Sequence, residues 1–248
     1  IRNSFQKIGN KNNYIKDKKV LNVIYKINKL INPKLETLTK KDYKDVAHKK
    51  GILYKCEYFD SSKLEFRRHN SKNNIENRFS IKPRYRKGGN EKLPSLPIIY
   101  LGLFRLFAFE ELDDKIDITN IKLNLPDKYL IELQRIYNKF TGIDINCTYM
   151  NNMSDIKNRL DFTTETEGID SNTISAGEDN LLIILTSLIS LRYYFECIDD
   201  STNDVESLLL IDEIDATLHP TYQLMLYDLI DEYSKEYKIQ VFFTTHSL

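Results

Sequence analysis

The chain has few cysteines, no long apolar run and no secretory signal pattern, and each absence excludes a class of protein. Its three cysteines, Cys56, Cys147 and Cys197, are odd in number and far apart. This pattern argues against a disulfide framework and offers no metal-ligand spacing. The longest apolar stretch, Leu181–Leu191, contains three hydroxyl side chains and is too short to span a bilayer. No signal pattern opens the sequence, so a cytoplasmic protein without a membrane partner is expected.

A phosphate-binding loop of the form Gly-x-x-x-x-Gly-Lys-Ser/Thr is also missing from the 248 residues, where Gly9 stands alone near the start. In proteins that carry such a loop, its backbone N–H groups cradle the phosphates of a nucleotide and its lysine contacts them. By itself, the chain is therefore expected to be inactive in any reaction that depends on this loop.

Net charge is zero, with 36 Lys and Arg against 36 Asp and Glu, but the charge is unevenly distributed. Residues 1–100 hold 25 basic and 9 acidic residues, a balance of +16, which leaves −16 for residues 101–248. A basic half beside an acidic half is typical of contact with DNA or RNA, or of complementary packing between subunits. The alternative is a solvated surface rich in lysine and asparagine.

Two apolar runs near the C-terminus end in polar residues of catalytic type. The first, Leu208–Ile211, leads directly into Asp212 and Glu213, and the second, 240–244, leads to His246. Continuous apolar runs are typical of buried parallel strands, and ligands bind at the carboxyl ends of such strands. Paired carboxylates at that place suit Mg²⁺ and a nucleotide triphosphate. The alternative is that the two acids merely end a strand.

A helix start precedes these strands. Ser175 and Glu178 have the spacing of a capping box, in which each side chain bonds the backbone N–H of the other residue. The helix that follows begins with Ala176 and Gly177. The first amides of a helix lack internal partners and favour anions, so the same residues also predict a phosphate contact.

The order of these features resembles that of ABC-type ATPases, in the soluble branch that includes SMC, RecF and OLD-type proteins. The stretches 174–180 and 209–220 are most similar to the ATPase of Septu-type and retron-associated antiphage systems. The resemblance covers residues 171–248, with a weaker likeness over 98–111. It implies an α/β fold of the P-loop NTPase class: an ABC ATPase-like head with a parallel core sheet, an antiparallel β-lobe and a helical lobe.

The resemblance implies ATP and Mg²⁺ as cofactors and gives roles to the residues at the strand ends. Asp212 would hold Mg²⁺ as the Walker B aspartate, and Glu213 would polarise the attacking water. His246 would be the switch histidine that contacts the γ-phosphate. Asp215 and His219, in and beside the D-loop segment, are assigned to the dimer interface, with plain turn and cap chemistry as the alternative. Arg105 is a further candidate near the phosphates.

Ser175, Gly177 and Glu178 match the signature motif, which in this family contacts the ATP held by the opposite protomer. The resemblance therefore implies a homodimer that sandwiches ATP. The sequence departs from the commonest form of the motif, with Ala176 in place of glycine and Glu178 in place of glutamine.

Hydrophobic periodicity and turn residues suggest four segments. Residues 1–50 are expected to hold helices and a basic loop, and residues 51–105 an antiparallel β-lobe and a core strand. Residues 106–172 are expected to form a helical lobe, because a clear amphipathic helix begins at Asp127. The range 173–248 carries the motifs. No coiled-coil heptads are present.

Two explanations for the missing phosphate-binding loop remain open. The chain is either a fragment that begins just after this loop, which is the expectation, or a degenerate relative that serves as a dimerisation scaffold. For a Septu-like protein the partner would be a separate HNH-type nuclease and the role antiphage defence. An OLD-like ATPase-nuclease and a RecF-like or SMC-like DNA repair ATPase are the alternatives. The 248 residues contain neither an HNH cluster nor further paired acids of a nuclease centre.

Overall fold

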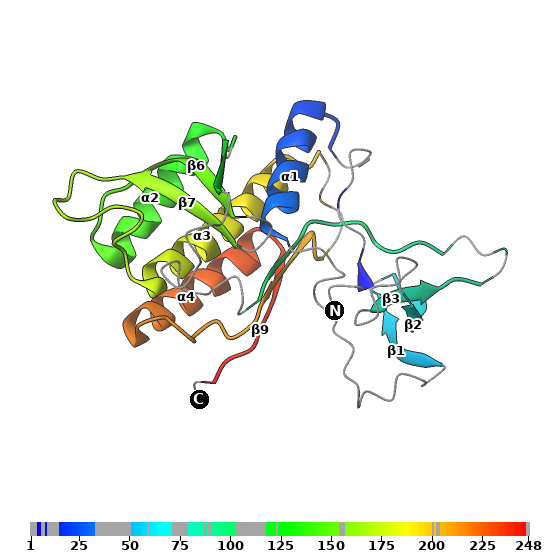
Figure 1. Ribbon diagram of the computed structural model, residues 1–248. Coiled ribbons are helices and arrows are strands. Elements are labelled where there is room, and N and C mark those ends of the chain that lie inside the picture. Colours follow the sequence, from blue (N-terminus) through cyan, green and yellow to red (C-terminus); the bar gives the residue numbers. More distant parts are fainter. Residues whose placement is uncertain are drawn as a thin grey trace. The chain divides into compact units, whose positions relative to one another are not determined.

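The computed structural model describes residues 4–5, 8, 15–32, 51–58, 60–70, 79–86, 88, 91–102, 118–122, 124–153, 157–199, 201 and 204–246 (Figure 1). The chain divides into two units, one made of Ile1–Lys7 with Pro33–Leu96 and the other of Ile8–Asn32 with Pro97–Leu248. Each unit has its own apolar core. In the part of the chain that is described, no helix combines the length and apolarity needed to cross a membrane.

The smaller unit is built on the expected antiparallel sheet. Strands β1 (Ile52–Glu57), β2 (Lys63–Asn70) and β3 (Phe79–Arg84) pair in that order. One face of this sheet is apolar, and Leu64 and Phe66 are buried there. Side chains alternate between the two faces of a strand, so the residues between them lie on the opposite, solvent-exposed face.

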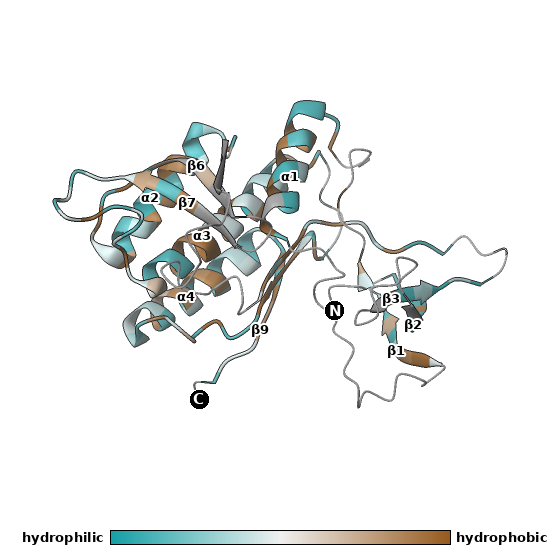
Figure 2. Ribbon diagram, in the orientation of Figure 1, coloured by the Kyte–Doolittle hydropathy of each residue, from teal (hydrophilic) through white to brown (hydrophobic). Residues whose placement is uncertain are grey.

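The larger unit contains the parallel core sheet, as expected. Strands β4 (Ile98–Leu101), β8 (Ser207–Ile211) and β9 (Ile239–Phe243) are parallel, with β8 in the middle. Every residue of β8 is buried, which explains its unbroken apolar sequence. Figure 2 shows these strands largely in the brown of hydrophobic residues. Helix α4 (Pro220–Glu236) connects β8 to β9 and packs on β9.

The side chain of the residue that follows helix α1 (Lys18–Ile31) forms hydrogen bonds with the outer edge of strand β4. Asn32, the residue that ends α1, donates from Nδ2 to the carbonyl of Ile98 and accepts at Oδ1 from the N–H of Tyr100, the latter at 3.0 Å. A primary amide presents one donor and one acceptor in the plane of an amide group, as a neighbouring strand does. Asn32 thus satisfies two backbone groups that an edge strand would otherwise leave unpaired.

Helix α3 (Ala176–Glu196) lies at the centre of this unit and contacts both β8 and a strand of a second sheet, β7 (Lys157–Thr163). Its residues are buried on nearly all sides, including Thr186, Ser187 and Ser190. Each of these hydroxyls donates to a carbonyl four residues earlier. A helix that is covered on all sides needs this internal pairing because no water reaches its polar groups.

Residues 106–172 were expected to form a helical lobe, but the described part of this range combines a helix with an antiparallel sheet. The described part contains one helix, α2 (Asp127–Thr141), and three antiparallel strands: β5 (Ile118–Lys122), β6 (Asn146–Met153) and β7 (Lys157–Thr163). The helix itself was predicted correctly, and Gly142 ends it in the left-handed conformation. Alternating buried side chains such as Leu160 and Phe162 carry the two-residue period of a strand, which the strong helical signal beside them obscured.

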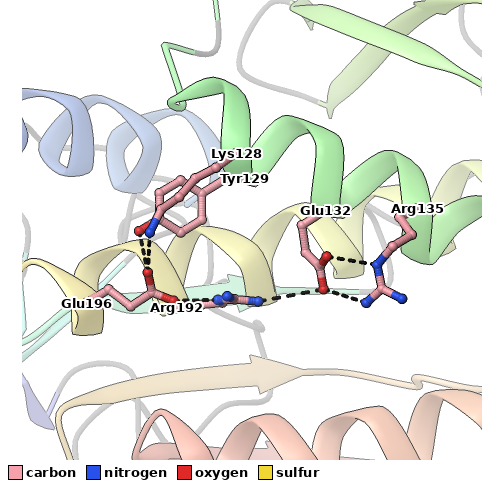
Figure 3. A network of polar contacts seen from close by, with 6 residues as sticks. All are labelled: Lys128, Tyr129, Glu132, Arg135, Arg192 and Glu196. Carbon is pink, nitrogen blue, oxygen red and sulfur yellow. Dashed lines mark hydrogen bonds and ion pairs between the residues drawn. The ribbon is translucent and has the colours of Figure 1, made fainter.

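A network of ion pairs joins α2 to α3 (Figure 3). Its members are Lys128, Tyr129, Glu132, Arg135, Arg192 and Glu196. Burial raises the pKa of Glu196, but hydrogen bonds from Lys128, Arg192 and Tyr129 outweigh it and lower the pKa to about 2. The guanidinium of Arg192 also lies 5.0 Å from the ring centre of Tyr237.

This network predicts acid sensitivity. The pKa of Glu196 is about 2 in the folded chain against an ordinary value of 4.5, so its stabilisation is complete above pH 4.5 and is lost as the pH falls through about 2. Solvent screens these ion pairs because Glu196 is an exposed residue, so their contribution to stability is smaller than the shift alone would give. We expect Glu196→Gln to lower the free energy of unfolding at pH 7 and to flatten its decline in acid, measured by urea unfolding across pH. The matched control is Glu167→Gln at an exposed position; if both variants lose stability in acid as the wild type does, Glu196 does not carry the effect.

Candidate functional site

The parallel register brings the two predicted strand ends to one edge of the sheet. Ile211 of β8 pairs with Phe243 of β9, so Asp212 and Glu213 follow one strand where Thr244 follows the other. Backbone bonds continue past the strands, from Thr244 N to the carbonyl of Ile211 at 3.0 Å and from Ile214 N to the carbonyl of Thr244 at 3.0 Å. The N–H of Asp212 donates to the carbonyl of Leu101 on β4 at 2.8 Å. All three strands therefore fix the position of the acid pair.

Glu213 and His246, far apart in the sequence, are in direct contact. His246 Nε2 lies 3.2 Å from Glu213 Oε1, which makes an ion pair when the imidazole is protonated. The side chain of Glu213 is 31% exposed and that of His246 is 77% exposed. Glu213 is thus partly enclosed and His246 is largely open to solvent, so a ligand can reach both groups.

Thr244 links the two acids and had no role in the sequence prediction. Its hydroxyl donates to Asp212 Oδ1 at 2.7 Å and accepts from the backbone N–H of Glu213 at 2.7 Å. Glu213 has a φ of 54°, in the left-handed region that residues other than glycine rarely adopt. The bond from Thr244 supports this conformation. A short hydroxyl residue at the end of the strand beside an acid pair is the signal that points to such a role.

Asp215 and His219 have local partners in this chain. The carboxylate of Asp215 accepts from the backbone N–H of His246 at 3.1 Å and 3.3 Å. The side chain of His219 accepts from Thr221 N at 3.3 Å and caps α4. The cap chemistry considered as the alternative for His219 is therefore present. Asp215 has a further effect, because it fixes the backbone that carries His246.

The start of α3 forms the predicted capping box. Ser175 Oγ accepts from Glu178 N at 3.3 Å, and Glu178 Oε2 accepts from both the N–H and the hydroxyl of Ser175 at 2.8 Å. The backbone N–H and the hydroxyl of Ser175 therefore both donate to the carboxylate of Glu178 in the same chain. A phosphate at this place would therefore compete with Glu178 for them.

Gly177 is buried against the turn that follows β8. A Cβ atom at this position would lie 2.5 Å from the carbonyl oxygen of Thr217. One turn further along α3, Asn180 Nδ2 donates to Thr217 Oγ1 at 2.6 Å. Glycine is thus required here for packing within one chain. Among the described residues, the hydrogen bonds of the capping box join Ser175 and Glu178 to each other, and none of them joins the start of α3 to Asp212, Glu213 or His246.

The donor set at the strand ends fits Mg²⁺ bound together with phosphates. In the residues that are described, no cluster of three or more His, Cys, Asp or Glu side chains is placed to hold a metal alone. Magnesium prefers oxygen ligands and is usually held by one or two carboxylates plus substrate phosphates. Asp212 and Glu213 provide such carboxylates, and Thr244 fixes one of them. Arg105 lies outside the described residues.

Comparison with known proteins identifies the family of the chain. The sequence model of the AAA ATPase domain matches residues 2–248. Comparison with the curated proteins and with the solved structures gave no match. The parallel sheet with its surrounding helices is consistent with the P-loop NTPase-like fold of that family, whose members generally use ATP and Mg²⁺. The chain belongs to the AAA ATPase domain family.

Proposed function

We propose that Asp212, Glu213 and His246 form the hydrolytic part of a Mg-ATP site. The observation that carries this proposal is the contact of 3.2 Å between Glu213 and His246 at the carboxyl ends of two adjacent parallel strands. Phosphoryl transfer depends mainly on positioning and electrostatics, and an acid pair at this edge of the sheet supplies both. The test is ATP hydrolysis by the full-length protein with and without the carboxylate of Glu213.

Each side chain has a distinct role in this proposal. Asp212 would hold Mg²⁺, which supplies charge neutralisation on the phosphates when it is bound. The carboxylate of Glu213 accepts a proton from, or orients, the attacking water. His246 contacts that carboxylate at 3.2 Å, and Asp215 fixes the backbone of His246. Hydrolysis also needs a phosphate-binding loop, and no such loop occurs among the 248 residues.

Ser175, Gly177 and Glu178 would contact the ATP of a second protomer in a homodimer. Support comes from the exposed start of α3, where Ser175 is accessible and the helix dipole favours an anion. Dimerisation on ATP binding would then release Ser175 from Glu178. We further propose that this cycle regulates a separate HNH-type nuclease in antiphage defence, on the basis of the resemblance of residues 174–180 and 209–220 to Septu-type ATPases.

Thr244 is expected to be a positioning residue for this site. Thr244→Val keeps the shape of the side chain but removes its bonds to Asp212 and to the backbone of Glu213. Hydrogen bonds that involve a charged group contribute about 1.5–3 kcal/mol, so kcat should fall roughly 10-fold to 100-fold while the KM for ATP changes little. Steady-state ATPase assays of the full-length protein measure both values.

Thr244→Ser is the matched control, because serine keeps the hydroxyl that makes both bonds. It should restore most of the activity lost in the valine variant. An equal loss in Thr244→Ser and Thr244→Val would mean that the methyl group and its packing matter instead of the hydrogen bonds.

A further inference from the structure

We propose that the solvent-exposed face of the β1–β2–β3 sheet binds the phosphate backbone of a nucleic acid. We call this surface the charged face. Its charged members, which alternate with the apolar side chains of the same strands, are Lys55, Glu57, Lys63, Glu65, Arg67, Lys82 and Arg84. The proposal concerns the smaller unit alone and goes beyond ATP hydrolysis.

Strand register places these side chains on one face. In an antiparallel pair, residues directly opposite each other point to the same side of the sheet. Glu65 of β2 is opposite both Lys55 of β1 and Arg84 of β3, and Arg67 is opposite Lys82. Phe66, between Glu65 and Arg67 in the sequence, is fully buried on the other side. The alternation therefore separates a core-facing side from a charged one.

The two acids of the charged face are already paired. Glu57 lies 2.8 Å from Lys63, and Glu65 lies 3.0 Å from Lys55 and 3.7 Å from Arg84. These ion pairs engage both carboxylates with three of the five basic side chains of the face, Lys55, Lys63 and Arg84. The face therefore keeps a positive excess, in the half of the sequence whose balance is +16.

Arg67 and Lys82 carry the main argument. They are directly opposite each other on adjacent strands, and both are exposed. Neither forms an ion pair with an acidic residue of the described part of the chain. Like charges that face each other across a sheet destabilise it, so the pair lowers the stability of the free protein. A phosphate bound between the two cations would turn this repulsion into attraction.

A nucleic acid fits this surface better than a membrane does. Neighbouring strands lie about 4.8 Å apart, so the cations form a dense array across the sheet. Affinity for a polyphosphate backbone comes from many such cations acting together through counterion release. Membrane binding draws in addition on apolar side chains inserted below the headgroups. Two apolar side chains of β1, Ile52 and Leu53 at the bulge, are 40% and 44% exposed, and they are few beside the seven charged members of this face.

The test uses Arg67→Glu in the full 248-residue chain. This change places opposite charges across from each other at Lys82, so the folded sheet should be as stable as before or more stable. It should also weaken binding to labelled DNA and RNA oligonucleotides about tenfold or more at low salt, and reduce the slope of log K against log salt by roughly one. Fluorescence anisotropy and thermal unfolding measure the two effects.

Lys26→Glu is the matched control. Lys26 is exposed on α1, lies in the same basic half of the sequence and undergoes the same change of charge. It should alter binding less than about twofold, apart from a small effect of net charge. Single-stranded and duplex probes both carry the phosphate backbone, so a comparison of their affinities shows which form of nucleic acid is bound.

Three results would overturn the proposal. The first is an absence of oligonucleotide binding by the wild-type chain at low salt. The second is an equal loss in Arg67→Glu and Lys26→Glu, which would indicate a general effect of net charge. The third is binding to phosphatidylserine-containing vesicles without binding to oligonucleotides. Each of these three results would leave the proposal for the ATP site unaffected, because no residue of that site belongs to the β1–β2–β3 sheet.

Discussion

Glu213→Gln in the full-length protein should abolish ATP turnover while ATP binding is retained. The amide has nearly the shape of the carboxylate and can still bond His246, but it cannot accept a proton from water. General-base catalysis contributes about 10²–10⁴ in rate, so kcat should fall at least roughly 100-fold. In a dimer that separates after hydrolysis, the same change should prolong the ATP-bound dimer. Phosphate release and size-exclusion chromatography with ATP measure these effects.

Glu165→Gln is the control, because it makes the same chemical change at an exposed position away from the strand ends. It should leave turnover and oligomeric state unchanged. A Glu213→Gln protein that hydrolyses ATP at the wild-type rate would show that another group activates the water. The contact between Glu213 and His246 would then have a structural role only.

Gly177→Ala should destabilise the fold, although alanine is the better helix former. In a helix interior this substitution normally contributes about 1 kcal/mol of stability. Here the new methyl group would lie 2.5 Å from the carbonyl oxygen of Thr217. That oxygen belongs to the backbone, so relief requires α3 or the turn to move, and such overpacking costs about 1–3 kcal/mol. We expect a net loss of stability, measured as the midpoint of urea unfolding.

The same movement should reach the candidate site. Asn180 would lose its bond of 2.6 Å to Thr217, and the turn contains Asp215, which holds the backbone of His246. ATP turnover in the full-length protein should therefore fall more than the loss of stability alone explains. Asn180→Ala, which removes the bond without adding volume, is the control and should have the smaller effect. A Gly177→Ala variant more stable than the wild type would contradict the close approach.

Local sequence patterns were sufficient for most elements of the core. The unbroken apolar run at 208–211 predicted a buried strand, and all of β8 is buried. The capping box at Ser175 and Glu178 and the glycine that ends α2 were also predicted correctly, because caps depend on neighbouring residues only. The strands β6 and β7 were missed. Their pairing is not local, and residues 146–163 show the two-residue period only weakly beside the strong amphipathic pattern of α2.

The sequence by itself determined which residue types end the two core strands, and so predicted that Asp212, Glu213 and His246 share one edge of a sheet. Only the tertiary structure decided what else is there. Thr244 bridges the acids and Asp215 holds His246, because parallel pairing of β8 with β9 brings together residues about thirty positions apart. The requirement for glycine at 177 likewise comes from a backbone contact with Thr217. Contacts of this kind depend on packing between elements, which no local pattern in the sequence encodes.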